Sequence, residues 1–237
     1  VLTFNTAPLL SENVTFLKPK VWAAELSVKF SSATKPEPVK DPPPKLNATT
    51  FPLSVLTDRF ENATPETEVK ETYEAGNIKA PVHLCGGNEE QLIQIFEKVD
   101  KDDWVFCSWR NHYHALLHGI PRDTLMDMIV RGKSMSVYSD KPKFYSSSIV
   151  GGILPIALGT AMSIKMKSEE NKVWCFVGDM TFETGVFHES YKYAKNFELP
   201  ITFIVEDNEF SVHTPTKLAW NKRQEIPDDV IYSQYKN

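Results

Sequence analysis

The chain has 237 residues, of which 41% are hydrophobic and 24% charged, and 26 Lys and Arg against 31 Asp and Glu give a formal net charge of −5. That length suits one large domain or a domain with an extension. An acidic balance gives no support to a nucleic-acid or membrane-surface role, because both depend on an excess of basic side chains. No apolar run approaches the roughly 20 residues of a membrane-spanning helix.

The cysteines are few, scattered and odd in number: Cys85, Cys107 and Cys175. This usage fits a reducing compartment better than a disulfide framework. The cytoplasm is therefore the simplest expectation, and the mitochondrial matrix is the alternative if a transit segment was removed ahead of Val1. Without a signal peptide, we interpret the three N-x-S/T sequons as chance occurrences in an Asn/Thr-rich segment; they begin at Asn13, Asn47 and Asn62.

The first 80 residues differ in character from the rest. Prolines crowd the stretch Lys35–Lys45, which favours an extended, polyproline-like linker. Val21–Phe30 suits a short strand or an amphipathic turn, and Phe51–Phe60 carries apolar residues that could dock on a neighbouring surface. We expect residues 1–80 to form an extended arm or linker, either wrapping a partner subunit or left from a preceding domain. Residues 81–237 are expected to form the main domain.

From about Pro81 onward, helical and strand patterns alternate. Apolar residues at helical spacing predict helices over Asn88–Val99, Pro121–Arg131, Ile149–Met166 and Thr184–Asn196. Short apolar runs predict strands over Asp103–Cys107, Val173–Val177 and Ile201–Val205. Strands that alternate with helices predict an α/β fold with a doubly wound, mainly parallel sheet.

Oxygen-bearing side chains follow two of these strands. The run Val173–Val177 ends in a Gly-Asp pair whose aspartate is Asp179, and the run Ile201–Val205 is followed by an acidic pair and Asn208. Because a helix joins the two strands, Asp179 and Asn208 are expected at the same edge of the sheet, where open α/β sheets bind ligands. A carboxylate and an amide oxygen suit a hard cation such as Mg²⁺, and such a cation suits a phosphate-bearing cofactor.

This stretch resembles the thiamine-diphosphate motif, in which Gly-Asp-Gly is followed by Asn after a turn, a helix and a strand. It is similar to that of the alpha subunit of the 2-oxo acid dehydrogenase decarboxylase component, of the pyruvate, branched-chain or acetoin type. The resemblance covers roughly residues 81–216 and implies the thiamine-diphosphate-binding fold. It also implies that Mg²⁺ is held against the cofactor's diphosphate by the side chains of Asp179 and Asn208 and the backbone carbonyl of Phe210.

Three upstream motifs resemble the same family and occur in its order. His83-Leu84 resembles a His-Leu pair near the diphosphate and the substrate, which makes His83 a catalytic candidate. Trp109-Arg110 resembles a Tyr-Arg pair whose arginine contacts the diphosphate, and a guanidinium fork suits a phosphate. Phe144–Ser163 resembles a segment whose backbone lies beside the aminopyrimidine. The resemblance thus implies a cofactor site at Trp109, Arg110, Ser148, Val150, Gly178, Asp179, Met180, Thr181 and Asn208.

Three segments depart from the family pattern. Met180 stands where the family has the second Gly, so that a side chain replaces backbone facing the diphosphate. Serines at 146–148 replace family glycines, and Ser211–Thr214 replaces Gly-Met-Gly-Thr. Within that last segment, His213 is a second catalytic candidate that could touch substrate or phosphate; an exposed loop residue without a role is the equal alternative.

Three histidines lie close together, at His112, His114 and His118. The last two are four residues apart and could share a helical face that binds a transition metal such as zinc. The stretch offers no cysteine or carboxylate as an obvious third ligand. The alternatives are that the histidines line the anionic pocket or form a polar loop.

The resemblance implies oxidative decarboxylation of a 2-oxo acid, with thiamine diphosphate accepting the electrons that decarboxylation releases. In the family, the glutamate that activates the aminopyrimidine comes from a beta-type chain or domain, so we expect a hetero-oligomer, with a lipoyl acyltransferase as a possible acceptor of the product. Two alternatives stay open. One is a transketolase-like half-enzyme that acts on sugar phosphates, and the other is a non-catalytic scaffold that keeps the fold.

Overall fold

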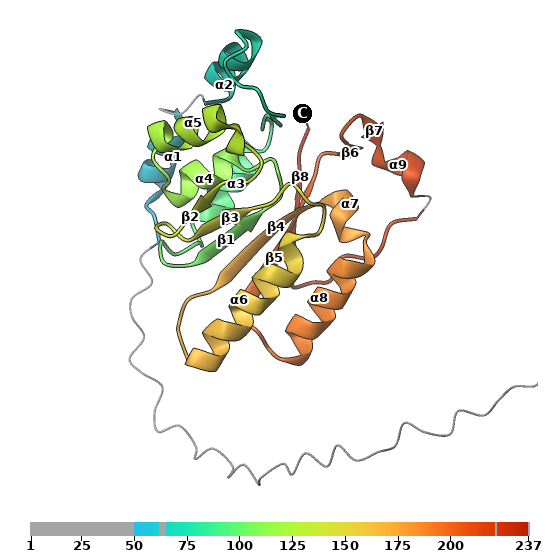
Figure 1. Cartoon of the computed structure of the whole chain (residues 1–237). Helices are drawn as coiled ribbons and strands as arrows, with labels where there is room; N and C mark the ends of the chain where they lie inside the picture. The colour runs from blue at the N-terminus through green and yellow to red at the C-terminus, as the bar shows by residue number, and fades with distance from the viewer. Residues whose placement is uncertain (1–49, 62–64, 221, 237) are drawn as a thin grey trace, which may run out of the picture. The chain divides into compact units, whose positions relative to one another are not determined.

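The computed structural model of the chain describes residues 50–61, 65–220 and 222–236 (Figure 1). The chain divides into two units, Val1–Lys45 and Leu46–Asn237, and all described residues belong to the second. The predictions for Val21–Phe30 and for the Pro-rich stretch Lys35–Lys45 therefore lie outside the described residues.

A mainly parallel sheet forms the centre of the second unit. Its strand order is β2-β3-β1-β4-β5-β8, and every neighbouring pair is parallel except β2 and β3. This confirms the predicted fold class. The strands are β1 (Trp104–Cys107), β2 (Tyr138–Ser139), β3 (Phe144–Ser146), β4 (Val173–Gly178), β5 (Ile201–Asp207) and β8 (Ile231–Gln234).

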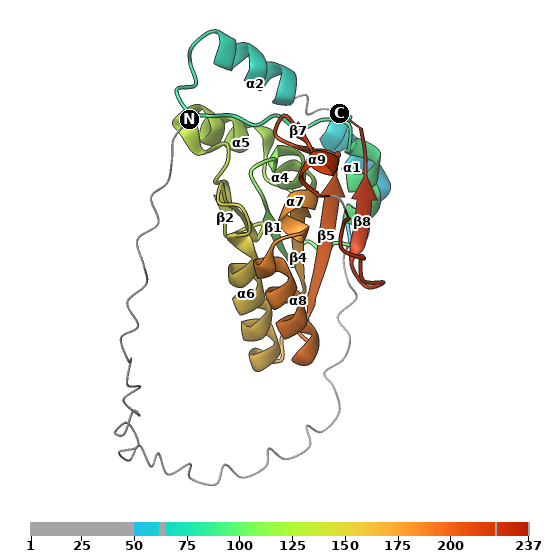
Figure 2. The same cartoon turned by 90° about the vertical axis from the view of Figure 1, so that its right-hand side faces the viewer.

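Helices cover both faces of this sheet (Figures 1 and 2). One face carries α1 (Leu53–Glu61), α3 (Glu89–Phe96), α4 (His112–His118) and α5 (Arg122–Met128), the last continued by a π-helical turn, η1 (Ile129–Lys133). The opposite face carries α6 (Ile153–Lys167) and α8 (Gly185–Asn196). The remaining elements are α2 (Pro65–Glu74), α7 (Asp179–Phe182), the β-hairpin of β6 (Phe210–Ser211) and β7 (Thr214–Pro215), and α9 (Thr216–Ala219).

The alternation of side chains along the strands explains the two apolar runs of the sequence. In β4, Trp174 and Phe176 pack with the helices of one face, whereas Val173, Cys175 and Val177 pack with α6 and α8 on the other. Because both faces are covered, the strand is apolar at every position from Val173 to Val177 rather than at alternate ones.

The predicted helices are confirmed as α3, α5, α6 and α8, with shifted ends. The largest shift is at α6, which begins at Ile153 rather than Ile149. Residues 149–152 form a turn in which Gly151 has a φ of +72°, a conformation that a side chain would disfavour. Ile149 and Val150 are apolar but exposed, and this is why the apolar pattern overruns the helix.

The described part of the predicted arm is a correction to the sequence prediction. Residues 53–61 and 65–74 are helical rather than extended, and Leu56, Val69 and Ile78 are buried in the core that covers one face of the sheet. Hydrophobic burial holds them there, so the compact unit begins well before residue 81. Among the described helices, none combines the length and apolar character needed to cross a bilayer.

Candidate active site at the carboxyl edge of the sheet

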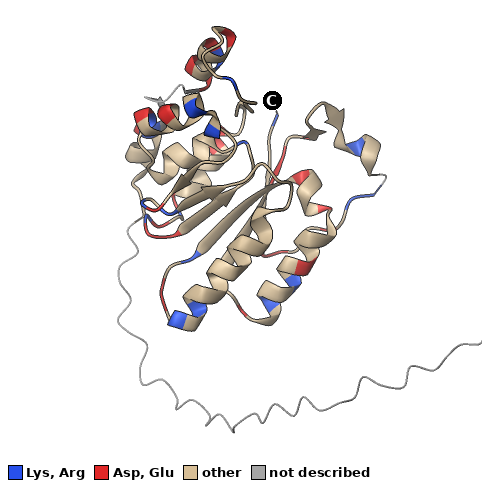
Figure 3. Ribbon diagram, in the orientation of Figure 1, with Lys and Arg blue, Asp and Glu red and all other residues tan. Residues whose placement is uncertain are grey.

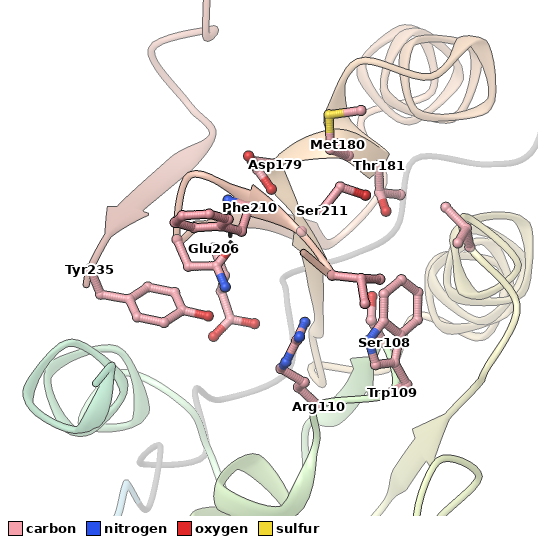
Figure 4. Close-up of a pocket in the computed structure, with 14 residues that line it drawn as sticks. Ser108, Trp109, Arg110, Asp179, Met180, Thr181, Glu206, Phe210, Ser211 and Tyr235 are labelled. Atoms are coloured by element: carbon pink, nitrogen blue, oxygen red, sulfur yellow. Dashed lines mark hydrogen bonds between the residues drawn. The ribbon is translucent and has the colours of Figure 1, made fainter. Parts of the chain in front are cut away.

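A small cavity of about 90 Å³ opens where three neighbouring strands end. After β1 the chain adds β3 on one side and then β4 on the other, so the cavity lies at the point where the direction of strand addition reverses. Open α/β sheets bind ligands at such a point, beyond the carboxyl ends of the strands. The lining residues are Ser108, Trp109, Arg110, Val150, Gly178, Asp179, Met180, Thr181, Glu206, Asn208, Phe210, Ser211, Val212 and Tyr235 (Figure 4).

Most of the residues predicted from the sequence converge on this cavity. Asp179 follows β4 and Asn208 follows β5, and both line the same space, as their strand-end positions predict. The predicted residues that line it are Trp109, Arg110, Val150, Gly178, Asp179, Met180, Thr181, Asn208 and Phe210. The structure shows that these residues lie around one cavity, and their roles in binding stay a prediction.

Three predicted residues do not line the cavity. His83 lies just outside, with its ring centroid 6.0 Å from that of Trp109. Burial, and then the cation of Arg110, lower the pKa of His83 below its usual value, which favours a neutral imidazole. Ser148 is exposed in the turn before α6, and His213 is exposed between β6 and β7. The exposed-loop alternative for His213 thus agrees with its position.

Arg110 is the cation that faces the cavity. Its guanidinium points into the space between Glu206 and the β6 strand (Figure 4). Within the part of the chain that the structure describes, it makes no hydrogen bond or ion pair. Close by, the buried indole N–H of Trp109 also has no hydrogen-bond partner among the described residues. Unpaired donors beside a cavity are what an anionic ligand would use.

Asp179 is instead paired with a residue that the sequence did not reveal. The guanidinium of Arg223 donates from Nη2 to Asp179 Oδ2 at 2.5 Å and to Thr216 Oγ1 at 2.8 Å, and from Nη1 to Asp207 Oδ2. The Asp207 side chain is fully buried, and that of Asp179 is 6% exposed. Two carboxylates from neighbouring strand ends are thereby joined by one cation.

The pKa values of this group follow from burial and charge. Burial, and then the Asp207 carboxylate, raise the pKa of Asp179 to about 6 against the opposing effect of Arg223. Burial alone would raise the pKa of Asp207, but hydrogen bonds from Arg223, Tyr232 and the Glu209 N–H outweigh it and hold that pKa below its usual range. The pKa of Arg223 is raised, since the two carboxylates outweigh burial. Arg223 therefore stays charged.

The predicted metal ligands fit a hard cation in type but not in their present pairing. Asp179 and Asn208 supply oxygen atoms, as Mg²⁺ prefers. However, Asp179 is held by Arg223, and Asn208 Oδ1 accepts a hydrogen bond from the Phe210 N–H at 3.1 Å. Over the described ranges, no three His, Cys, Asp or Glu side chains form a metal-binding group. The oxygens are in place, but Asp179 Oδ2 is already held by Arg223.

The Met180 side chain fills less of the space between the strand ends than its position in the motif predicts. The indole N–H of Trp220 donates to the Met180 sulfur, with an N···S distance of 3.1 Å. The side chain is accordingly turned away from Arg110 and Glu206 (Figure 4). The departure from Gly at this position thus leaves the space between the strand ends open.

The floor of the cavity carries further polar residues that sequence reasoning missed. Glu206 accepts a hydrogen bond from Asn88 Nδ2 at 2.9 Å, and its Oε1 lies 3.2 Å from His114 Nε2, within ion-pair distance but at an angle poor for hydrogen bonding. The hydroxyl of Tyr235 points toward Glu206 (Figure 4), and burial followed by this carboxylate raises the pKa of Tyr235. Glu206 could have been predicted, because it lies two residues before Asn208 at the end of the same strand. No feature of the sequence pointed to Tyr235.

The three clustered histidines do not form a metal site. All three are buried in α4, and their rings contact different partners. His112 bonds Glu66 and Ser134, each at 2.9 Å, and His118 Nε2 lies 3.1 Å from the Asp103 carbonyl. The zinc and polar-loop alternatives are therefore wrong, and none of the three lines the cavity.

Comparison with known proteins finds similarity over most of the chain. The family model described as dehydrogenase E1 component matches residues 62–226. The chain is 30% identical over 164 residues to the alpha subunit of acetoin:2,6-dichlorophenolindophenol oxidoreductase of Bacillus subtilis, covering 65% of this chain and 49% of the relative.

Two pyruvate dehydrogenase E1 component alpha subunits are also similar. That of Porphyra purpurea is 28% identical over 202 residues, covering 78% of this chain and 58% of its own length. That of Rickettsia bellii is 30% identical over 174 residues, covering 69% of this chain and 52% of the relative. The chain thus spans about half the length of the curated relatives it matches.

Proposed function

Because the chain belongs to the dehydrogenase E1 component family, we propose that it is the alpha-type chain of an enzyme that oxidatively decarboxylates a 2-oxo acid with thiamine diphosphate and Mg²⁺. The observation that carries this proposal is the convergence of Arg110, Asp179 and Asn208, from the ends of three neighbouring strands, on one cavity. An unpaired guanidinium beside oxygen ligands is the combination that a metal-bound diphosphate requires.

In this proposal the chain's own residues anchor the cofactor. Arg110 binds the diphosphate, while Asp179, Asn208 and the Phe210 carbonyl hold Mg²⁺. Gly178, Met180 and Thr181 border the diphosphate, and Trp109, Ser148 and Val150 border the ring end. His83, whose lowered pKa favours the neutral imidazole, can accept a proton near pH 7. The cofactor itself supplies the electron sink for decarboxylation.

The size of the cavity favours a site that is shared with a second chain. Its volume of about 90 Å³ is well below the roughly 300–1,000 Å³ of small-molecule pockets. We therefore propose a beta-type chain that covers the cofactor and supplies the activating glutamate, and a lipoyl acyltransferase as a further partner. Neither nucleic acid nor a membrane enters this proposal, and its compartment is the cytoplasm or, alternatively, the mitochondrial matrix.

The test is a calorimetric titration of the full chain, co-expressed with a beta-type partner, with thiamine diphosphate in the presence of Mg²⁺. Binding is expected for the native protein, and a loss of binding for Asp179→Asn. Decarboxylation is then measured with pyruvate, branched 2-oxo acids and ketose phosphates, of which only 2-oxo acids should react. Turnover of ketose phosphates alone would support the transketolase-like alternative.

A non-catalytic relative is the second candidate, and one observation favours it. Arg223 occupies Asp179, the only charged ligand predicted for the metal. If the paired native complex bound no thiamine diphosphate at any Mg²⁺ concentration, the scaffold function would replace the enzymatic one.

A further inference from the structure

Arg223 makes three contacts that hold it at the carboxyl edge of the sheet. One side of its guanidinium fork reaches Asp179 Oδ2 at 2.5 Å and Thr216 Oγ1 at 2.8 Å, and the other side reaches Asp207 Oδ2. The fork thus bridges the ends of β4 and β5, which are neighbouring strands of the sheet. Charge-assisted hydrogen bonds to two different carboxylates fix both the position and the orientation of the guanidinium.

Asp207 is built to keep the arginine in place. Its Oδ1 accepts the Glu209 N–H at 2.7 Å, and its Oδ2 accepts both the Tyr232 hydroxyl and Arg223. With these donors in place and no exposed surface, the Asp207 carboxylate is committed to protein partners. Asp179 is different, because its side chain also lines the cavity where ligands would enter.

A second cavity gives Arg223 a place to go. This neighbouring space of about 510 Å³ is bordered by Arg223 itself, and the Arg223 side chain is 34% exposed. The wall of the cavity also contains Glu209, and among the described residues its carboxylate accepts one hydrogen bond, from Gln234 Nε2 to Oε1 at a long 3.4 Å. A guanidinium that leaves Asp179 therefore has a carboxylate within the adjoining space.

A guanidinium and a divalent cation compete for such a carboxylate. Both carry positive charge and both are stabilised by the Asp179 carboxylate, of which Arg223 holds Oδ2, so that the presence of one cation makes binding of the other less favourable at close range. We propose that Arg223 is a tethered cation that competes with the divalent metal for Asp179, and that it must withdraw toward the neighbouring cavity before the metal binds. This rests on the proposed function, since it takes Asp179 as a metal ligand.

The expected effect follows from the occupancy of the pair. If Arg223 holds Asp179 in about 90–99% of molecules when no metal is bound, the apparent metal affinity is lowered by about 10- to 100-fold. Replacing Arg223 by an uncharged residue of similar length should recover that factor. A lysine, which keeps the positive charge but lacks the planar guanidinium, should recover only part of that gain in metal affinity.

The experiment measures Mn²⁺ binding to the full chain by electron paramagnetic resonance, with inorganic pyrophosphate present as the diphosphate probe. The variants are Arg223→Gln, Arg223→Lys and, as a matched control, Arg122→Gln, which removes an exposed arginine paired with Glu68. Arg223→Gln is expected to bind Mn²⁺ at least about tenfold more tightly than the native chain. Arg223→Lys should fall between the two, and Arg122→Gln should match the native chain.

Several outcomes separate this inference from the proposed function. If Arg223→Gln binds Mn²⁺ no more tightly than the native chain, the proposed competition is overturned. It is also overturned if the double variant Arg223→Gln, Asp179→Asn still binds Mn²⁺ more tightly than the native chain. If Arg223→Gln does not fold, as judged by circular dichroism, Arg223→Lys decides, and native-like affinity in that variant overturns the inference. Absence of Mn²⁺ binding in the native chain and in every folded variant would instead overturn the metal site of the proposed function and, with it, this inference.

Discussion

The clearest test of the candidate site is to remove the positive charge of Arg110 while keeping most of the length of its side chain. Arg110 faces the cavity and makes no hydrogen bond or ion pair with the described residues. Arg110→Gln should therefore weaken binding of thiamine diphosphate and leave the fold unchanged. Few arginines permit this separation, because most also stabilise the folded chain through ion pairs.

The size of the effect follows from the bonds that the guanidinium can offer. A hydrogen bond to a charged group contributes about 1.5–3 kcal/mol, and that range corresponds to a loss of about 10- to 150-fold in affinity. The free energy of unfolding should change by less than about 0.5 kcal/mol, as is usual when a side chain without structural partners is replaced.

Titration calorimetry of the paired complex with thiamine diphosphate and Mg²⁺ gives the dissociation constant, and urea denaturation gives the stability. Arg122→Gln is the matched control, because its guanidinium pairs with Glu68 and does not line the cavity. The reasoning is refuted if Arg110→Gln binds the cofactor within about twofold of the native complex, which is a difference below ~0.5 kcal/mol.

Three further predictions concern stability and the departure at Met180. Burial lowers the pKa of His118 to about 4, below the usual value of about 6.5 for a histidine, so the unfolded state binds more protons between these values. Lowering the pH from 6.5 to 4 should therefore cost about 3 kcal/mol of stability, and His118→Gln should remove this contribution in urea denaturation. Gly151→Ala should lower the free energy of unfolding by about 2–3 kcal/mol, since φ is +72° and the new Cβ would lie 2.7 Å from Val186. Gly159→Ala has open space around its Cβ and should leave the stability unchanged or raise it by up to ~1 kcal/mol. Equal melting temperatures of the two variants would contradict this. Met180→Gly should change the calorimetric dissociation constant of thiamine diphosphate less than about threefold, under ~0.7 kcal/mol, because the side chain already turns away from Arg110 and Glu206. A tenfold change would contradict that orientation.

The sequence predicted the fold best where burial is uniform. The strands at Val173–Val177 and Ile201–Val205 are apolar because helices cover both faces, and such runs are easily recognised. The strands β2, β3 and β8 were not predicted, because they are two to four residues long and carry polar side chains among the apolar ones. Short, mixed segments have too little periodicity to identify a strand.

For the candidate site, the sequence predicted what lies next to a strand end and missed what arrives from elsewhere. Asp179 and Asn208 follow strands directly, so their positions could be inferred from the chain order alone. Arg223 reaches Asp179 across 44 positions, and no local pattern signals such a contact. The histidines of α4 were misread for a related reason, since burial of a polar ring such as His112 depends on partners distant in sequence.

The segments that form the site differ in how firmly they are attached. Arg110, Asp179 and Asn208 follow β1, β4 and β5, which are adjacent strands inside the sheet, whereas Arg223 belongs to the stretch 222–230, which contains neither helix nor strand. Substitutions and insertions are tolerated far better in such connecting stretches than in a packed sheet. Descendants of this chain could therefore gain or lose the proposed competing cation by small changes in one loop, while the strands that position Arg110, Asp179 and Asn208 stay unchanged.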